Sequence, residues 1–203
     1  MRAPLGHSGV KLKRRQVLGG LCAFSVGYSK LATSQEPGSS EPPTEGDHIV
    51  FAYGEHAGKP IAPDDLAMGV EQIFAFPQDP ASKVVRNGTR LNQLIVVRLS
   101  VEGMSEATLN RSADGVVAYS GVCSHTGCDV TDWNEEFVRF QCPCHESQFD
   151  PNDAARVVGG PAPWPLAAVP LKISDGLVTV AGGFEGRVGF MQPGQDPFSS
   201  FGQ

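Results

Sequence analysis

The sequence has few charged residues, few cysteines and no apolar run long enough to span a membrane. Charged residues make up 19% of the 203 residues, whereas glycine (24) and proline (16) are frequent. This balance favours a turn-rich β protein over a helical one. The N-terminal apolar stretch Val17–Tyr28 falls short of the ~20 residues that a spanning helix needs.

Positive charge is scarce outside the N-terminus. The first 34 residues hold six of the 16 basic residues and no acid, which leaves 10 basic against 22 acidic residues, a net charge of −12, in the rest. An acidic surface argues against binding to nucleic acid, which is itself an anion. It is compatible with a basic partner such as a cytochrome c, or with solubility alone.

Four of the five cysteines lie in two short segments that also contain histidine. Residues 123–128 read Cys-Ser-His-Thr-Gly-Cys, and residues 142–147 read Cys-Pro-Cys-His-Glu-Ser. The first segment supplies Cys-x-His and the second Cys-x-x-His. Two thiolates and two imidazoles are the ligand set of a [2Fe–2S] centre in which cysteines hold one iron and histidines the other.

A structural zinc site is the alternative, since zinc also takes cysteine and histidine. Zinc sites usually show repeated Cys-x-x-Cys or His-x-x-x-His pairs, whereas each segment here gives one ligand of each type. A plain disulfide framework would not explain histidines at fixed offsets from cysteines. We therefore expect an iron–sulfur cluster, with a zinc-binding module as the less favoured interpretation.

The two segments resemble the cluster-binding motifs of Rieske [2Fe–2S] proteins, and the resemblance extends over roughly residues 70–190. It implies one [2Fe–2S] cluster per chain, with the ligands Cys123, His125, Cys142 and His145. It also implies a disulfide between Cys128 and Cys144 that clamps the ligand loops. This extra cysteine pair is typical of respiratory Rieske proteins and is absent from the oxygenase type. We therefore expect an electron-transfer subunit that has no catalytic residues of its own.

Residues near the second segment are expected to tune or cover the cluster. By resemblance, Ser147 donates its hydroxyl to a bridging sulfide. Phe149 stands where cytochrome bc1 Rieske subunits have a tyrosine that donates to a ligand sulfur, and Glu146 stands where they have glycine. Both differences favour a lower reduction potential. A stiff loop is expected to cover the cluster from a third side, and it consists of Gly160, Pro161, Ala162 and Pro163.

Two kinds of respiratory complex contain similar subunits. The small subunit of arsenite oxidase is similar at Val117–Ser120, Phe149–Asp150 and Gly183–Val188, whereas the bc1 subunit is similar at the proline loop. We expect the small subunit of an arsenite-oxidase-like complex, with a larger molybdopterin subunit as donor and a cytochrome c as acceptor. The alternative is a bc1-type subunit, with cytochromes b and c1 as partners.

The N-terminus predicts export. Lys13-Arg14-Arg15 before the apolar stretch resembles a twin-arginine signal, and the small residues 32–34 offer a cleavage site. This route carries folded proteins, which suits a cluster inserted in the cytoplasm, and a disulfide persists in the periplasm. We therefore expect a periplasmic location, with an uncleaved membrane anchor as the alternative.

Short apolar and β-branched runs between turn residues predict strands, and residues 64–70 predict a helical turn. The expected strands are 70–76, 94–99, 115–119, 137–141, 169–173 and 177–181. The expected fold is all-β, a Rieske-type antiparallel β-sandwich with an inserted cluster-binding subdomain. We expect an export signal at 1–34, a disordered linker at 35–48, a Rieske domain at 49–190 with its cluster-binding part at about 119–165, and a tail at 191–203.

Overall fold

The computed structural model of the protein describes residues 35–190. The expected export signal and C-terminal tail lie outside the described residues. Within 35–190, no helix combines the length and the apolar character that crossing a membrane requires.

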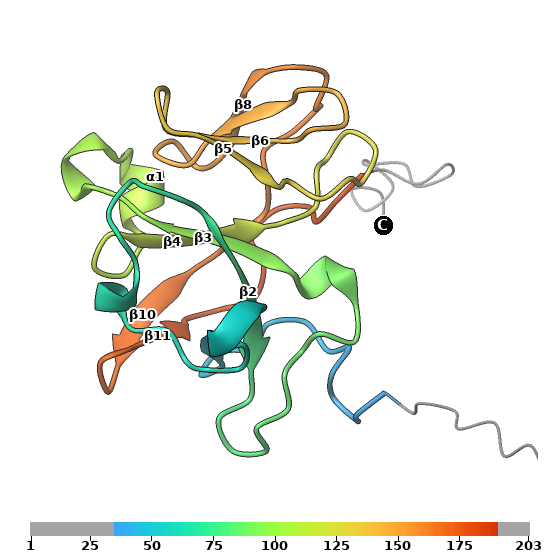
Figure 1. The fold of residues 1–203 in the computed structure, drawn as a ribbon, viewed down its shortest axis with the longest axis vertical. Helices are drawn as coiled ribbons and strands as arrows, with labels where there is room; N and C mark the ends of the chain where they lie inside the picture. The colour runs from blue at the N-terminus through green and yellow to red at the C-terminus, as the bar shows by residue number, and fades with distance from the viewer. Residues whose placement is uncertain (1–34, 191–203) are drawn as a thin grey trace, which may run out of the picture. The chain divides into compact units, whose positions relative to one another are not determined.

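Two antiparallel sheets form the fold (Figure 1). The first has the strand order β10-β11-β1-β2-β3-β4-β9, and the second has the order β5-β6-β7-β8. In the described residues the one α-helix, α1, is a single turn at Glu106–Leu109, which confirms the all-β prediction. The strands are β1 (His48–Phe51), β2 (Ile73–Gln78), β3 (Leu94–Arg98), β4 (Val116–Ser120), β5 (Asp132–Asn134), β6 (Arg139–Gln141), β7 (Gln148–Asp150), β8 (Arg156–Gly159), β9 (Ala168–Val169), β10 (Leu171–Ser174) and β11 (Leu177–Val180).

Strands β3 and β4 are buried on both faces and separate two hydrophobic cores. Successive strand side chains point to opposite faces, so Ile95 and Val97 enter one core while Leu94 and Val96 enter the other. The first core lies toward the four-stranded sheet and contains Cys123 and Cys142. Double burial explains why β3 reads as an unbroken apolar run without alternation.

Most expected strands form with shifted ends, but the expected helical turn at 64–70 was wrong. A short 3₁₀ turn covers Pro63–Asp65, and the chain then continues in bends and an isolated bridge. The hairpin turn between β10 and β11 does form: Ser174 pairs with Leu177, and Asp175 and Gly176 have φ of 51° and 77°. Two positive φ values in a two-residue loop match the twist of the strands that it joins.

The structure also corrects the expected disordered linker at 35–48. The Asp47 carboxylate accepts hydrogen bonds from the Arg86 guanidinium at 2.6 and 2.9 Å, and both side chains are buried. The Asn92 side-chain amide donates to the Glu41 carbonyl at 2.6 Å. The Gly88 N–H donates to the Ser39 carbonyl at 2.8 Å. The segment has little apolar surface to bury, so its composition predicts disorder. Hydrogen bonds to residues 86–92 hold it instead.

Candidate metal centre

The two cysteine–histidine segments are loops at the edge of the first core. One connects β4 to β5 and the other connects β6 to β7. In the first loop, the Cys123 N–H donates to the Cys128 carbonyl at 2.8 Å and the Gly127 N–H donates to that of Cys123 at 3.0 Å. The second loop has the same arrangement. The Cys142 N–H donates to the Ser147 carbonyl, and the Glu146 N–H donates to the Cys142 carbonyl, both at 2.9 Å. Each loop is therefore a closed, backbone-bonded turn.

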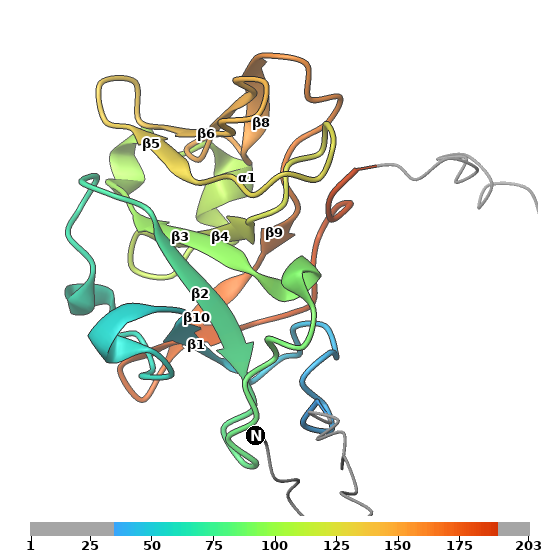
Figure 2. The same cartoon turned by 45° about the vertical axis from the view of Figure 1, so that its right-hand side comes forward.

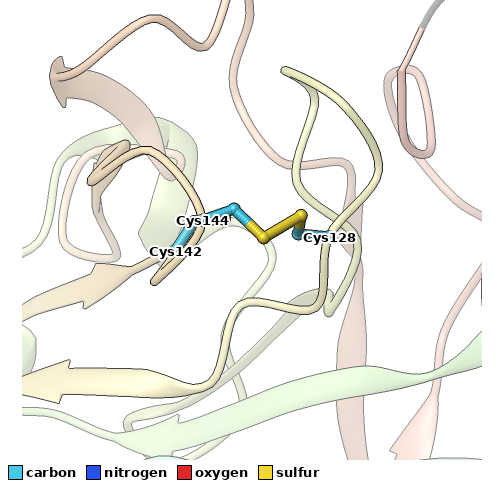
Figure 3. A group of neighbouring side chains, drawn as sticks. All are labelled: Cys128, Cys142 and Cys144. Carbon is cyan, nitrogen blue, oxygen red and sulfur yellow. A yellow bond between two sulfur atoms is a disulfide. The ribbon is translucent and has the colours of Figure 1, made fainter.

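A disulfide joins the tips of these loops. Cys128 and Cys144 are bonded, with their Cα atoms 6.5 Å apart (Figure 3). The expected disulfide is thus confirmed. The sulfur atom of Cys142 lies within 4.8 Å of both disulfide sulfurs. A disulfide offers no thiolate to a metal, so of these three cysteines only Cys142 could be a ligand.

The four expected ligand residues have the character that a [2Fe–2S] site needs. Cys123 and Cys142 are free thiols buried in the first core. The rings of His125 and His145 lie perpendicular, with their centroids 4.6 Å apart. His125 Nδ1 is buried and has no hydrogen-bond partner among the described residues, so its lone pair is free for a metal. Burial raises the pKa of the Cys142 thiol to about 11, which a metal ion would reverse by holding the thiolate.

Ser147 is placed to act on a cluster. The side chain is fully buried, and its Oγ accepts a hydrogen bond from the Ala162 N–H at 3.2 Å. Within residues 35–190 no acceptor is found for the hydroxyl proton. A serine hydroxyl both donates and accepts, so this O–H remains available to a sulfide of a bound cluster.

The expected proline loop packs against the second ligand loop. A Cβ added at Gly160 would lie 2.5 Å from Ser147 Cα and 2.7 Å from the Glu146 carbonyl oxygen. Further along, the Ser124 hydroxyl donates to the Trp164 carbonyl at 2.6 Å, and the Trp164 indole N–H donates to the Gly189 carbonyl at 3.2 Å. The loop is therefore tied to the second ligand loop, to the first, and to the C-terminal segment.

Aromatic side chains fill the volume behind the site. Phe149 is fully buried in the same core as the two thiols. The Tyr119 hydroxyl donates to the Pro151 carbonyl at 2.9 Å, and burial raises the pKa of Tyr119 to about 12. Tyr119 and Trp133 both pack on Phe140, with ring centroids 5.9 and 5.5 Å away. These contacts support core packing as the role of Tyr119 and Trp133.

Sequence reasoning missed two residues that brace the first ligand loop. Arg90 donates to the Gly127 carbonyl and to the Asp129 carboxylate, both at 2.6 Å. Ser124 binds the proline loop from 40 residues away. No local pattern marks either residue, because their partners are distant in sequence.

The pairing of two buried thiols with two imidazoles on disulfide-linked loops defines the class of an iron–sulfur electron-transfer protein. Residues 81–170 match the family model of the Rieske [2Fe-2S] domain. The chain is 31% identical to the cytochrome bc1 complex Rieske iron-sulfur subunit of Streptomyces lividans over 157 residues, which cover 73% of this chain and 92% of that protein. The chain therefore belongs to the Rieske iron–sulfur protein family, and it binds a [2Fe–2S] cluster.

Two further relatives are longer than this chain. The bc1 Rieske subunit of Streptomyces coelicolor is 30% identical over 188 residues, covering 88% of this chain and 52% of that protein. A protein named as the Rieske subunit of a respiratory nitrate reductase in Haloferax mediterranei is 36% identical over 156 residues. The match covers 76% of this chain and 64% of that protein. Among solved structures, the soluble domain of Rieske protein II from Sulfolobus acidocaldarius gives a TM-score of 0.38 at 21% identity. The match covers 50% of this chain and 66% of that structure. The family assignment rests on the sequence relatives.

Removing the disulfide should loosen the centre. The Cys128→Ser/Cys144→Ser double variant should lose about 3 kcal/mol of unfolding free energy, because a cross-link spanning 16 residues restricts the unfolded chain. Chemical denaturation of the variant and the parent measures this loss. Adding a reductant should lower the midpoint of the parent toward that of the variant and leave the variant unchanged. Equal midpoints without reductant would contradict the prediction.

Proposed function

We propose that the chain relays single electrons inside a respiratory complex, between a larger redox subunit and a cytochrome c-type acceptor. The unpartnered Nδ1 of His125, together with the two buried free thiols, is the observation that supports this proposal. Cys123 and Cys142 would hold one iron, and His125 and His145 the other. When bound, the cluster supplies one-electron redox chemistry, and imidazole ligation raises its potential into the range of roughly −150 to +300 mV.

For the surrounding complex we favour a bc1-type quinol–cytochrome c reductase. The Streptomyces relatives are bc1 subunits, and the proline loop resembles the bc1 pattern. His145 is exposed, which suits contact with a partner. In such a complex cytochromes b and c1 would be the partners.

An arsenite-oxidase-like complex with a molybdopterin subunit is the second candidate. Phe149 favours it, because this fully buried side chain brings no hydroxyl to the core that holds both thiols. Glu146 also departs from the bc1 pattern. Under either candidate the twin-arginine pattern supports a periplasmic location after folded export, with retention on the membrane by an uncleaved N-terminus as the other outcome.

Purification from the native host tests the function and separates the candidates. Reduced protein should give the rhombic EPR signal of a one-electron-reduced [2Fe–2S] cluster. If a quinol reduces the signal-bearing protein in membranes and a cytochrome b co-purifies, the bc1-type complex is supported. If arsenite reduces it and a molybdenum protein co-purifies, the second candidate is supported. A colourless protein with bound zinc would refute both.

Restoring a hydroxyl at residue 149 should raise the reduction potential. In Phe149→Tyr, a hydroxyl enters the core that holds both thiols and can donate to a ligand sulfur, which stabilises the more negative reduced state. One net hydrogen bond of roughly 1.4 kcal/mol corresponds to about 60 mV for one electron. Protein-film voltammetry measures the shift. Phe140→Tyr, at an equally buried phenylalanine of the same core, is the control and should move the potential less. An unchanged potential in Phe149→Tyr would contradict this account of the tuning.

A further inference from the structure

Glu146 is held in a backbone conformation that disfavours its own side chain. Its φ is +58°, in the left-handed region, and it directly follows His145. Its N–H donates to the Cys142 carbonyl at 2.9 Å, and its carbonyl lies against Gly160, so the loop fixes this conformation. Glycine would adopt this φ without strain, whereas a residue with a Cβ loses stability there.

The carboxylate of Glu146 forms no bond that would offset the strain in its backbone. The Glu146 side chain is exposed, and within residues 35–190 it has no ion pair or hydrogen bond. A side chain held at a cost and left unbonded by its own protein is compatible with a role outside the fold. Asp175 shares both features in the β10–β11 hairpin, so the position of Glu146 next to the proposed ligand His145 is what points to such a role.

Few exposed residues of the loops that surround the proposed cluster site carry a charge. We define the cluster face as the exposed residues within 123–131, 142–147 and 160–165: Thr126, Asp129, Thr131, Pro143, Cys144, His145, Glu146, Gly160, Pro161, Pro163 and Pro165. Asp129 forms an ion pair with Arg90 at 2.6 Å. Glu146 is therefore the one exposed charge without an ion pair on the described cluster face, next to a proposed ligand. The half-buried Arg187 stacks on Trp164 at 5.2 Å, beside the proline loop.

We propose that Glu146 is a recognition residue for the electron-transfer partner, which presents a lysine or arginine against the cluster face. This proposal rests on the proposed electron-transfer function and adds the chemistry of the contact. Prolines and the disulfide give the face a stiff, uncharged surface, so a single carboxylate beside His145 sets which approaching charge is favoured. A cation at this position is attracted to the point where the electron leaves, and an anion is repelled.

Small oxidants of opposite charge test this electrostatic effect. The probes are tris(phenanthroline)cobalt(III), a trication, and hexacyanoferrate(III), a trianion, mixed with dithionite-reduced holoprotein in stopped flow at low ionic strength. Each metal(III) ion takes one electron from the reduced protein and becomes metal(II), and no bond forms or breaks. Glu146→Gln removes the charge and keeps the side-chain size. It should slow oxidation by the cobalt complex about threefold to tenfold and accelerate oxidation by the iron complex, and both effects should shrink in high salt.

Asp175 provides the matched control. It is an exposed carboxylate with φ of +51° in the β10–β11 hairpin, away from the ligand loops in both views (Figures 1 and 2). Asp175→Asn should leave both rates unchanged. Equal effects of the two variants would overturn the proposal, and so would rates that shift in the same direction for both probes, because a change in potential alone does that.

A second measurement separates strain from charge. Glu146→Gly removes both, and Glu146→Gln removes the charge alone. Chemical denaturation should give Glu146→Gly the higher midpoint, while both variants show the same change in oxidation rates. A lower midpoint for Glu146→Gly would overturn the premise that the carboxylate is kept at a cost. Failure of the proposed function would look different, since the parent protein would then show no cluster signal at all.

Discussion

Replacing Cys142 by alanine should abolish the cluster. Cys142 is a buried free thiol at the start of the second ligand loop. Of the three cysteines whose sulfurs lie within 4.8 Å of one another, it alone is not in the disulfide. Without its thiolate, one iron loses half of its protein ligands, and a methyl group cannot replace them. Iron bound per chain should fall from about two to near zero, and the visible absorption and the EPR signal should disappear.

Two further variants keep this result interpretable. His145→Ala removes an exposed ligand, so it should lose the cluster without opening a hole in the core. Cys22→Ala removes the one cysteine outside the two segments and should keep full iron content. A Cys142→Ala protein that retained the rhombic EPR signal would show that the ligand set is wrong.

Substituting alanine at Gly160 should severely destabilise the protein. The residue has φ of +77°, and an added Cβ would lie 2.5 Å from Ser147 Cα and 2.7 Å from Ser147 N. The loss of stability combines the strain of a left-handed backbone with steric overlap against backbone atoms, which cannot move away as a flexible side chain could. Together these effects should reduce the unfolding free energy by about 4 kcal/mol. Because Ser147 and Glu146 would be displaced, the reduction potential should change as well.

Gly176 supplies the control for Gly160. It has the same φ of +77°, but nothing lies within 4 Å of an added Cβ. Gly176→Ala should therefore cost only the strain, about 1 kcal/mol, and leave the potential unchanged. Denaturant titration of the two holoproteins measures the difference. Equal losses in the two variants would mean that the contact between the proline loop and the second ligand loop contributes nothing.

The centre could be predicted from sequence because its ligands lie in short segments with fixed spacing. Cysteine and histidine at these offsets carry little information about the rest of the fold but specify the donor set. The expected disulfide forms in the structure. Ser147 is buried and accepts a hydrogen bond from the Ala162 N–H of the proline loop, while the roles of both toward the cluster stay predictions.

Contacts between distant residues could not be predicted in the same way. Arg86 holds Asp47 from 39 residues away, so a segment with the composition of a linker is ordered. Ser124 and Trp164 join two loops through a backbone carbonyl, which no side-chain pattern reveals. The strain at Glu146 could not be predicted from the sequence either, because the φ of Glu146 depends on the closed turn of its loop and on the contact with Gly160.

Labelling the histidines with ¹⁵N and recording pulsed EPR on the reduced protein tests the central claim most directly. Cluster ligation by His125 and His145 predicts hyperfine couplings from two ligating nitrogens, and loss of the cluster signal in His145→Ala. A reduced cluster without ¹⁵N-histidine couplings, or an EPR-silent protein that binds zinc, would contradict the account.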